Sequence, residues 1–125
     1  MAMASVLGIG GVFFKSSDPA KLAAWYERWL NLDIESSFGG TAFLPSRLPE
    51  KARVVWAPFP ESTTYFDPSS KPFMINLIVD DVATALRQVG EGGAQVVGEP
   101  ETVENGTFGW FIDPEGNKVE LWQPK

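Results

Sequence analysis

In the first half of the chain, one stretch repeats its hydrophobic positions at helical spacing, and short apolar runs lie on either side of it. In residues 21–30 the apolar side chains return every three or four positions, which predicts an amphipathic helix. Ser17-Asp18-Pro19 stands just before it and is a typical helix start, because Asp can cap free N–H groups and Pro fits the first turn. The strands predicted around this helix are short apolar runs at residues 8–14, 31–36, 41–44 and 53–59.

The same order of elements returns in the second half. Residues 73–79 predict a strand, and Asp80-Asp81 opens a second helix that ends at the glycines after Val89. Residues 94–97 predict a strand and residues 98–106 a loop. Each half therefore contains a strand, a helix and three further strands, which is the pattern of an internal repeat.

The last predicted element is a β-hairpin at residues 107–124. D-P-E-G-N at 113–117 is its turn, because Pro presets φ and Gly takes a left-handed position. With Asp113 opposite Asn117, Trp110 lies opposite Glu120, whereas a slip of one residue would bring Phe111 there instead. Period-two alternation places Lys118, Glu120 and Trp122 on one face, and Val119 and Leu121 on the other.

We predict an α+β chain of two βαβββ modules within one domain, residues 1–125. Module one covers about 6–60, a linker about 61–71, and module two about 72–124. The polar stretch at 60–71 contains two aromatic residues, Tyr65 and Phe66. A stretch of this kind is either a lid over a pocket or a plain connection between the modules.

Composition narrows the classes of partner. A net charge of −6 without a basic cluster argues against nucleic acid and anionic membranes. There is no apolar run of the roughly 20 residues that a membrane span requires, and we expect no signal peptide. The absence of cysteine leaves no disulfide framework, so we expect a cytoplasmic protein.

The absence of histidine is the most informative feature of the composition. Without His or Cys, zinc sites with imidazole or thiolate ligands are excluded, as are Ser-His-Asp and Cys-His catalysts. Acid–base chemistry would depend on carboxylates, on Lys, or on Tyr26 and Tyr65.

Three features together resemble the vicinal oxygen chelate superfamily: the paired modules, V-D-D at 79–81, and D-P-E-G-N-K-V-E-L-W at 113–122. This superfamily includes glyoxalase I, extradiol dioxygenases, and bleomycin and fosfomycin resistance proteins. The resemblance covers nearly the whole chain. It implies that the two modules curl their sheets into an incomplete barrel around a ligand cup, and that the protein is a homodimer.

Enzymes of this superfamily hold a divalent metal in the cup with four side chains. The resemblance places the last of these ligands at Glu120, but Gly11, Met74 and the segment 54–56 supply no ligand at the other three places. Asn76 would add only a weak carbonyl ligand. One carboxylate does not fix a divalent cation, so we expect no metal and no other cofactor.

The resemblance also implies which side chains line the cup: Phe13, Trp56, Met74, Asn76, Trp110, Glu120 and Trp122. Aromatic walls with a few polar groups are typical of a small-molecule site. We therefore predict metal-free binding of a small apolar or aromatic molecule, and the acidic chain suits a cationic one. Three alternatives stay open. The aromatics could fill a closed core, Glu120 could be a solvated strand residue, or the protein could be a glyoxalase- or lyase-like enzyme using Glu120 as acid or base or in a non-standard divalent metal site.

Overall fold

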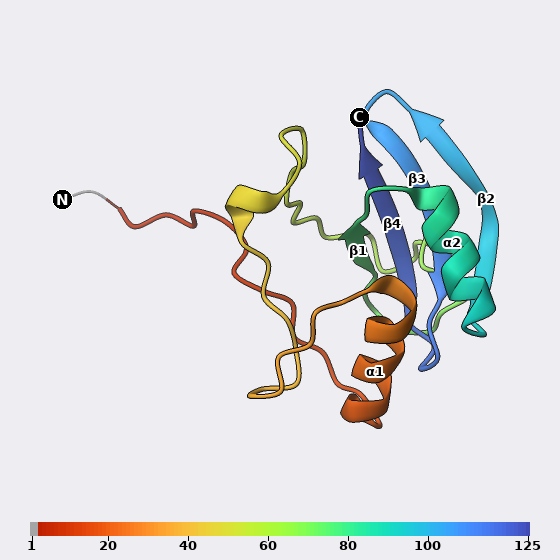
Figure 1. Ribbon diagram of the computed structural model, residues 1–125. Helices are drawn as coiled ribbons and strands as arrows, with labels where there is room; N and C mark the ends of the chain where they lie inside the picture. Colours follow the sequence, from red (N-terminus) through yellow and green to blue (C-terminus); the bar gives the residue numbers. More distant parts are fainter. Residues whose placement is uncertain (1–2) are drawn as a thin grey trace.

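The computed structural model describes residues 3–125 and has a four-stranded sheet in its second half (Figure 1). The strands are β1 (Ile75–Ile78), β2 (Gln95–Val103), β3 (Gly106–Ile112) and β4 (Lys118–Pro124), in the spatial order β1-β4-β3-β2. β1 runs parallel to β4, whereas β4 with β3 and β3 with β2 are antiparallel. The architecture is mixed α+β.

Two α-helices, α1 (Pro19–Leu30) and α2 (Val82–Glu91), begin where the sequence predicts them. The Asp18 carboxylate accepts a hydrogen bond from the backbone N–H of Lys21 at 3.2 Å. The Asp81 carboxylate accepts one from the backbone N–H of Thr84 at 3.0 Å. The caps satisfy backbone donors that a helix start leaves free. A short 3-10 helix, η1 (Pro45–Arg47), lies in the first half. None of the helices within residues 3–125 has the length and apolar character needed to cross a bilayer.

The core lies between the two helices and one face of the sheet (Figure 1). α2 approaches β3 closely at Gly109, where a Cβ atom would come within 2.8 Å of side-chain atoms of Val82 and Leu86. Glycine is therefore the residue that allows this contact. The buried core residues are Leu22, Tyr26, Val82, Ala85, Leu86, Val89, Phe111, Val119 and Leu121.

The hairpin has the predicted register and the predicted faces. Trp110 pairs with Glu120, and Ile112 pairs with Lys118. Val119 and Leu121 belong to the core beneath the helices. Since side chains alternate along a strand, Glu120 lies on the opposite face of the sheet, which we call the open face because α1 and α2 do not cover it. Its β4 residues Lys118, Glu120 and Trp122 are nevertheless each less than 10% exposed. The alternative register with Phe111 opposite Glu120 is excluded, because Phe111 pairs with Val119 and is completely buried.

The predicted end of the second strand of this half is wrong. Instead of a strand at 94–97 and a loop at 98–106, β2 continues to Val103. Its pairing with β3 shifts register between Val97 and Glu101, and Gly98 has a φ of 68°. Gly98 and Pro100 indicated a loop, but on an edge strand such residues also mark a bulge after which pairing resumes.

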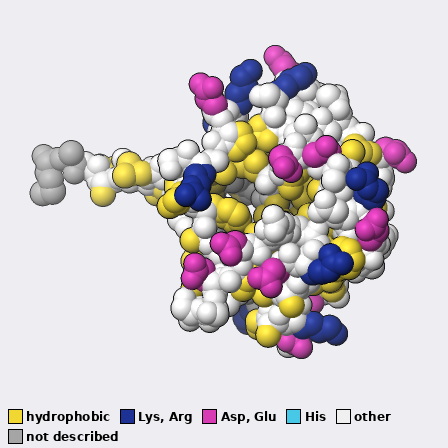
Figure 2. Space-filling view, in the orientation of Figure 1, with side chains coloured by type: hydrophobic (Ala, Val, Ile, Leu, Met, Phe, Trp, Pro, Cys, Tyr) yellow, Lys and Arg dark blue, Asp and Glu magenta, His cyan; other side chains and the backbone are white. Residues whose placement is uncertain are grey.

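The four strands predicted in the first half are not formed in this structure. Within residues 3–74, β-pairing is limited to an isolated bridge between Glu35 and Gly40. The other predicted strands are unpaired segments with exposed apolar side chains, including Phe13 at 95% and Trp56 at 79%. The N-terminal arm projects from the body of the molecule (Figure 2). Strand formers favour extended backbone, but a strand also requires a neighbouring edge.

Candidate functional site

Three strands bring two of the predicted cup residues, Trp110 and Asn76, to the carboxylate of a third, Glu120. The Glu120 side chain, 8% exposed on β4, accepts from Trp110 Nε1 on β3 at 2.8 Å. It also accepts from Asn76 Nδ2 on β1 at 2.7 Å. Both neighbours stand directly opposite Glu120 in the two ladders. The sheet register itself therefore builds this cluster on the open face.

A third donor comes from the loop between the two halves. The Tyr65 hydroxyl donates to Glu120 Oε2 at 2.5 Å. The Tyr65 ring stacks on Phe59 with centroids 5.8 Å apart, and meets Trp110 edge-on at 6.4 Å. Burial, followed by the hydrogen bond to Glu120, raises the pKa of Tyr65 to about 12. Tyr65 is thus held as a neutral hydrogen-bond donor at neutral pH.

Lys118 is the cation beside this cluster. Its side chain is only 7% exposed, and its Nζ donates to the backbone oxygen of Tyr65 at 2.6 Å. The same nitrogen lies 5.2 Å from the centre of the Tyr65 ring, a cation–π distance. Burial lowers the pKa of Lys118, and the charge of Glu120 opposes that shift. Lys118 therefore fixes the loop over the sheet.

Trp122 continues the open face two residues beyond Glu120. Its ring stacks on Phe108 with centroids 6.0 Å apart and an interplanar angle of 7°, and its Nε1 donates to Asn105 O at 3.1 Å. Trp122 also borders a hollow of about 500 Å³. The hollow's other lining residues are Lys51, Arg53, Val55, Glu104, Asn105 and Lys125. Trp122 is 7% exposed, and it is the aromatic residue among those that line this hollow.

The structure does not bring all seven predicted cup residues together. Met74 is half-buried and immediately precedes β1. Phe13 and Trp56 lie exposed in unpaired segments of the first half. The sequence-based prediction gives too little weight to Tyr65. The feature that indicates it is the pair of neighbouring aromatic residues, Tyr65 and Phe66, within an otherwise polar loop. The sequence-based prediction also omits Lys118 from the site, although the predicted alternation placed it on the face of Glu120.

The described residues do not gather a ligand set typical of a transition metal. Within residues 3–125, no three His, Cys, Asp or Glu side chains lie together in a way that could hold an ion. The oxygens of Glu120 instead face three neutral donors. Chemically, the cluster is a partly enclosed carboxylate that accepts hydrogen bonds beside aromatic rings.

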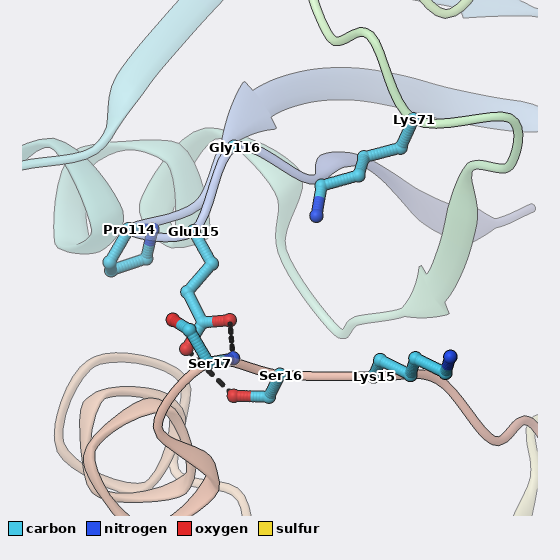
Figure 3. A pocket seen from close by; sticks show the side chains of 7 residues that line it. All are labelled: Lys15, Ser16, Ser17, Lys71, Pro114, Glu115 and Gly116. Atoms are coloured by element: carbon cyan, nitrogen blue, oxygen red, sulfur yellow. Dashed lines mark hydrogen bonds between the residues drawn. The ribbon is translucent and has the colours of Figure 1, made fainter.

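A second hollow, of about 590 Å³, lies where the β3–β4 turn meets the start of α1 (Figure 3). The Glu115 side chain points from the turn to the segment before the helix (Figure 3). It accepts from Ser16 Oγ at 2.7 Å, from the Ser17 N–H at 2.9 Å and from the Asp18 N–H at 3.3 Å. Lys15 and Lys71 also line the hollow. Glu115 therefore joins the hairpin of the second half to the first helix.

Glu115 is expected to make the stability of the protein depend on pH. The hydrogen bond from Ser16 holds the pKa of Glu115 below its ordinary value of 4.5. The contribution of Glu115 to the free energy of unfolding is therefore complete above the pKa that Glu115 has in the unfolded chain. It is lost as the pH falls through the lower pKa that Glu115 has in the folded protein. Urea titrations measure the free energy of unfolding at about pH 6 and at about pH 3. Between these two pH values, the free energy of unfolding should fall less in Glu115→Gln than in the wild type.

Glu104→Gln, on the exposed β2–β3 turn, is the matched control for this prediction. The free energy of unfolding of this control should change between the two pH values as much as that of the wild type. If Glu115→Gln also shows the wild-type change, the role given to the Glu115 hydrogen bonds is contradicted.

Comparison with known proteins identifies the family of the chain. The model of a family described as a glyoxalase-like domain matches residues 11–122. The chain belongs to the glyoxalase-like domain family. This confirms the resemblance to the vicinal oxygen chelate superfamily. No curated protein matches the chain.

A solved structure adds a likeness of fold over the full chain. TnmS3 from Streptomyces sp. CB03234, described as an antibiotic binding protein, is 24% identical over 100% of this chain and 99% of that chain, with a TM-score of 0.54. A member of the glyoxalase/bleomycin resistance protein/dioxygenase superfamily from Sphaerobacter thermophilus DSM 20745 is 32% identical over 39% of this chain and 40% of that chain, with a TM-score of 0.36. The hypothetical protein SA1046 from S. aureus is 26% identical over 44% of this chain and 45% of that chain, with a TM-score of 0.40. The chain thus spans less than half the length of these last two proteins.

Proposed function

We propose that this glyoxalase-like protein binds a small apolar or aromatic molecule in a cup on the open face of its sheet, without a metal. The observation that carries the proposal is the Glu120 cluster, in which a carboxylate and the Trp110 indole share one partly enclosed surface. Flat aromatic walls with a few fixed polar groups are the usual composition of small-molecule sites. The antibiotic-binding TnmS3, which shares the fold, supports the same type of function.

The composition of the cup supports binding without a metal. The places that supply metal ligands in enzymes of the superfamily contain Gly11, Met74 and the apolar segment 54–56 here. Glu120 is the remaining carboxylate, and it already accepts from Asn76 and Trp110. These residues do not fit a divalent cation, which requires four to six well-placed ligands. The net charge of −6 favours a neutral or cationic molecule over an anionic one.

Binding is expected to depend on the Trp110 ring. Titration calorimetry with naphthalene, 1-naphthylmethylamine and 1-naphthoate compares a neutral, a cationic and an anionic aromatic of similar size. Trp110→Ala should weaken binding of the first two compounds about 10-fold or more, as loss of a central aromatic contact does. 1-Naphthoate should bind most weakly, because Glu120 repels its carboxylate.

The matched control replaces a tryptophan outside the cup. Trp29→Ala removes an indole on α1 that packs near Arg28 and Gly92, and it should leave the three affinities unchanged. Equal effects of the two replacements would contradict a cup at Trp110. Stoichiometric binding of Mn²⁺ or Zn²⁺ that is lost in Glu120→Gln would instead support the enzyme alternative and overturn metal-free binding.

We further propose that the cup is completed in a homodimer of two-module chains. β1 pairs on one side only within residues 3–125, which leaves a backbone edge available to another strand. The unpaired first-half segments expose large apolar side chains such as Phe13 and Trp56. Large apolar side chains exposed in this way favour a protein–protein contact. In the proposed dimer, Phe13 and Trp56 of each chain cover the cup of the other.

A further inference from the structure

Tyr65 occupies a position in the cup that a ligand would be expected to take. It comes from the loop rather than from the sheet, and its ring lies between Phe59, Trp110 and Lys118. Its hydroxyl donates to Glu120 Oε2 at 2.5 Å. One phenol group therefore makes a stacked contact, an edge contact, a cation–π contact and a hydrogen bond to a carboxylate. These are the contacts by which proteins recognise aromatic molecules.

The loop holds this side chain without burying it in the core. Tyr65 is 41% exposed, whereas Tyr26, in the core, is 9% exposed. The loop backbone has supports of its own, including the bond from Lys118 Nζ to Tyr65 O and the 2.6 Å bond from Ser69 Oγ to Gly116 O. Since the loop backbone is held independently, release of the cup requires displacement of the phenol ring and not of the loop.

We propose that Tyr65 is an internal substitute for the ligand and that the cup takes a hydroxyaryl molecule, whose hydroxyl replaces the Tyr65 hydroxyl on Glu120. This inference rests on the proposed function and names its ligand class. Departure of Tyr65 leaves Glu120 Oε2 short of one donor, while Asn76 and Trp110 still donate. A partly enclosed carboxylate that loses a hydrogen bond is destabilised. A ligand that presents a hydroxyl to Glu120 is therefore favoured over one that presents only the apolar edge of its ring.

The surrounding charges favour a neutral hydroxyl over a charged group. A ligand carboxylate would face Glu120 with no proton to donate, whereas an ammonium would approach Lys118 Nζ, which lies 5.2 Å from the Tyr65 ring centre. The site raises the pKa of Tyr65 to about 12, and a phenol in the same place would likewise keep its proton. Any positive charge on the ligand would therefore lie elsewhere on the molecule.

A hollow lies farther along the same face, beside Trp122. Trp122 lies two residues from Glu120 on β4, about 7 Å away along a strand. It borders the hollow of about 500 Å³ and stacks on Phe108. A fused-ring compound with its hydroxyl on Glu120 would extend toward this hollow.

The test compares 2-naphthol with naphthalene, which differ by one hydroxyl, in calorimetric titrations of the full chain. Tyr65→Gly should bind 2-naphthol at least 10-fold more tightly than the wild type does, and at least 10-fold more tightly than it binds naphthalene. Adding Glu120→Gln should reduce this preference several-fold, because the hydrogen bond is no longer to a charged group. Phe66→Gly is the matched control: it also removes a loop ring that contacts Phe59, and it should create no preference.

A second measurement uses the wild-type chain and therefore does not depend on a variant folding. The protein contains two tyrosines, so ¹³C labelling of tyrosine gives signals from Tyr26 and Tyr65. 2-Naphthol should shift the Tyr65 ring signals and leave those of Tyr26, in the core, unchanged. Naphthalene at the same concentration should shift the Tyr65 signals less.

The possible failures are distinguishable. Equal affinity of Tyr65→Gly for both compounds, or 2-naphthol binding that leaves the Tyr65 signals unmoved, would overturn the substitution of Tyr65 by a ligand hydroxyl while aromatic binding stands. Absence of binding by either compound to every variant would overturn the proposed function as well.

Discussion

Replacement of Asp113 by alanine is expected to lower the free energy of unfolding by about 3–4 kcal/mol, the cost of breaking a buried polar network. Asp113 is 5% exposed at the start of the β3–β4 turn. Its carboxylate accepts from the backbone N–H groups of Glu115 and Asn117 at 2.9 and 3.0 Å, and from Asn117 Nδ2. It also accepts from the Tyr26 hydroxyl on α1 at 2.9 Å.

The size of this effect follows from what the alanine variant leaves behind. Asn117 is 1% exposed and Tyr26 is 9% exposed, so both would keep buried donors without their acceptor. Each such donor costs roughly 1–3 kcal/mol when water does not replace the partner. Burial, with the charge of Asp113 beside it, raises the pKa of Tyr26 well above its ordinary value, so this hydroxyl remains a donor throughout the accessible pH range.

Urea unfolding followed by circular dichroism measures the change. Tyr26→Phe is the matched control, because it removes one of the donors and keeps the ring that packs near Phe111. It should cost about 1–2 kcal/mol. If Asp113→Ala costs no more than Tyr26→Phe, the carboxylate does not organise the turn and the prediction is wrong.

The same residues show what the sequence can predict and where it stops. D-P-E-G-N predicts a turn because its constraints are local, and the hairpin register follows from that turn together with the buried alternation of Val119 and Leu121. The contact of Asp113 with Tyr26 depends on how α1 sits on the sheet, which residue spacing does not determine. Asn76 was placed beside Glu120 by the superfamily resemblance, and the ladder between β1 and β4 brings them together.

The first half shows the opposite case. Its apolar segments were predicted as strands from the same residue preferences that succeeded in β3 and β4. In a hairpin the partner strand is supplied a few residues later, but a nearby partner is not sufficient, because residues 31–36 and 41–44 pair only through the Glu35–Gly40 bridge. The segments at 8–14 and 53–59 need an edge from a distant part of this chain or from another chain. The structure shows them unpaired and exposed. Local pattern predicts extended backbone, and a distant edge decides whether it becomes a strand.

Charge replacements at Phe13 and Trp56 are expected to convert the proposed homodimer into a monomer. Phe13 is 95% exposed and Trp56 is 79% exposed in the single chain. Burying an aromatic side chain of about 150–250 Å² at about 25 cal/mol per Å² contributes roughly 4–6 kcal/mol before the costs of association. The variant Phe13→Asp/Trp56→Asp should therefore weaken association at least 100-fold. Sedimentation equilibrium should give about twice the chain mass of 13.7 kDa for the wild type, and the chain mass for the variant.

The matched control for these replacements is Phe38→Asp. Phe38 is also exposed, at 65%, but it lies in a turn closed by the Glu35–Gly40 bridge, whose backbone already has its partner. This variant should remain dimeric. Sedimentation of the wild type as a monomer at about 100 µM would contradict the dimer, since an interface built on these aromatics should persist far below that concentration.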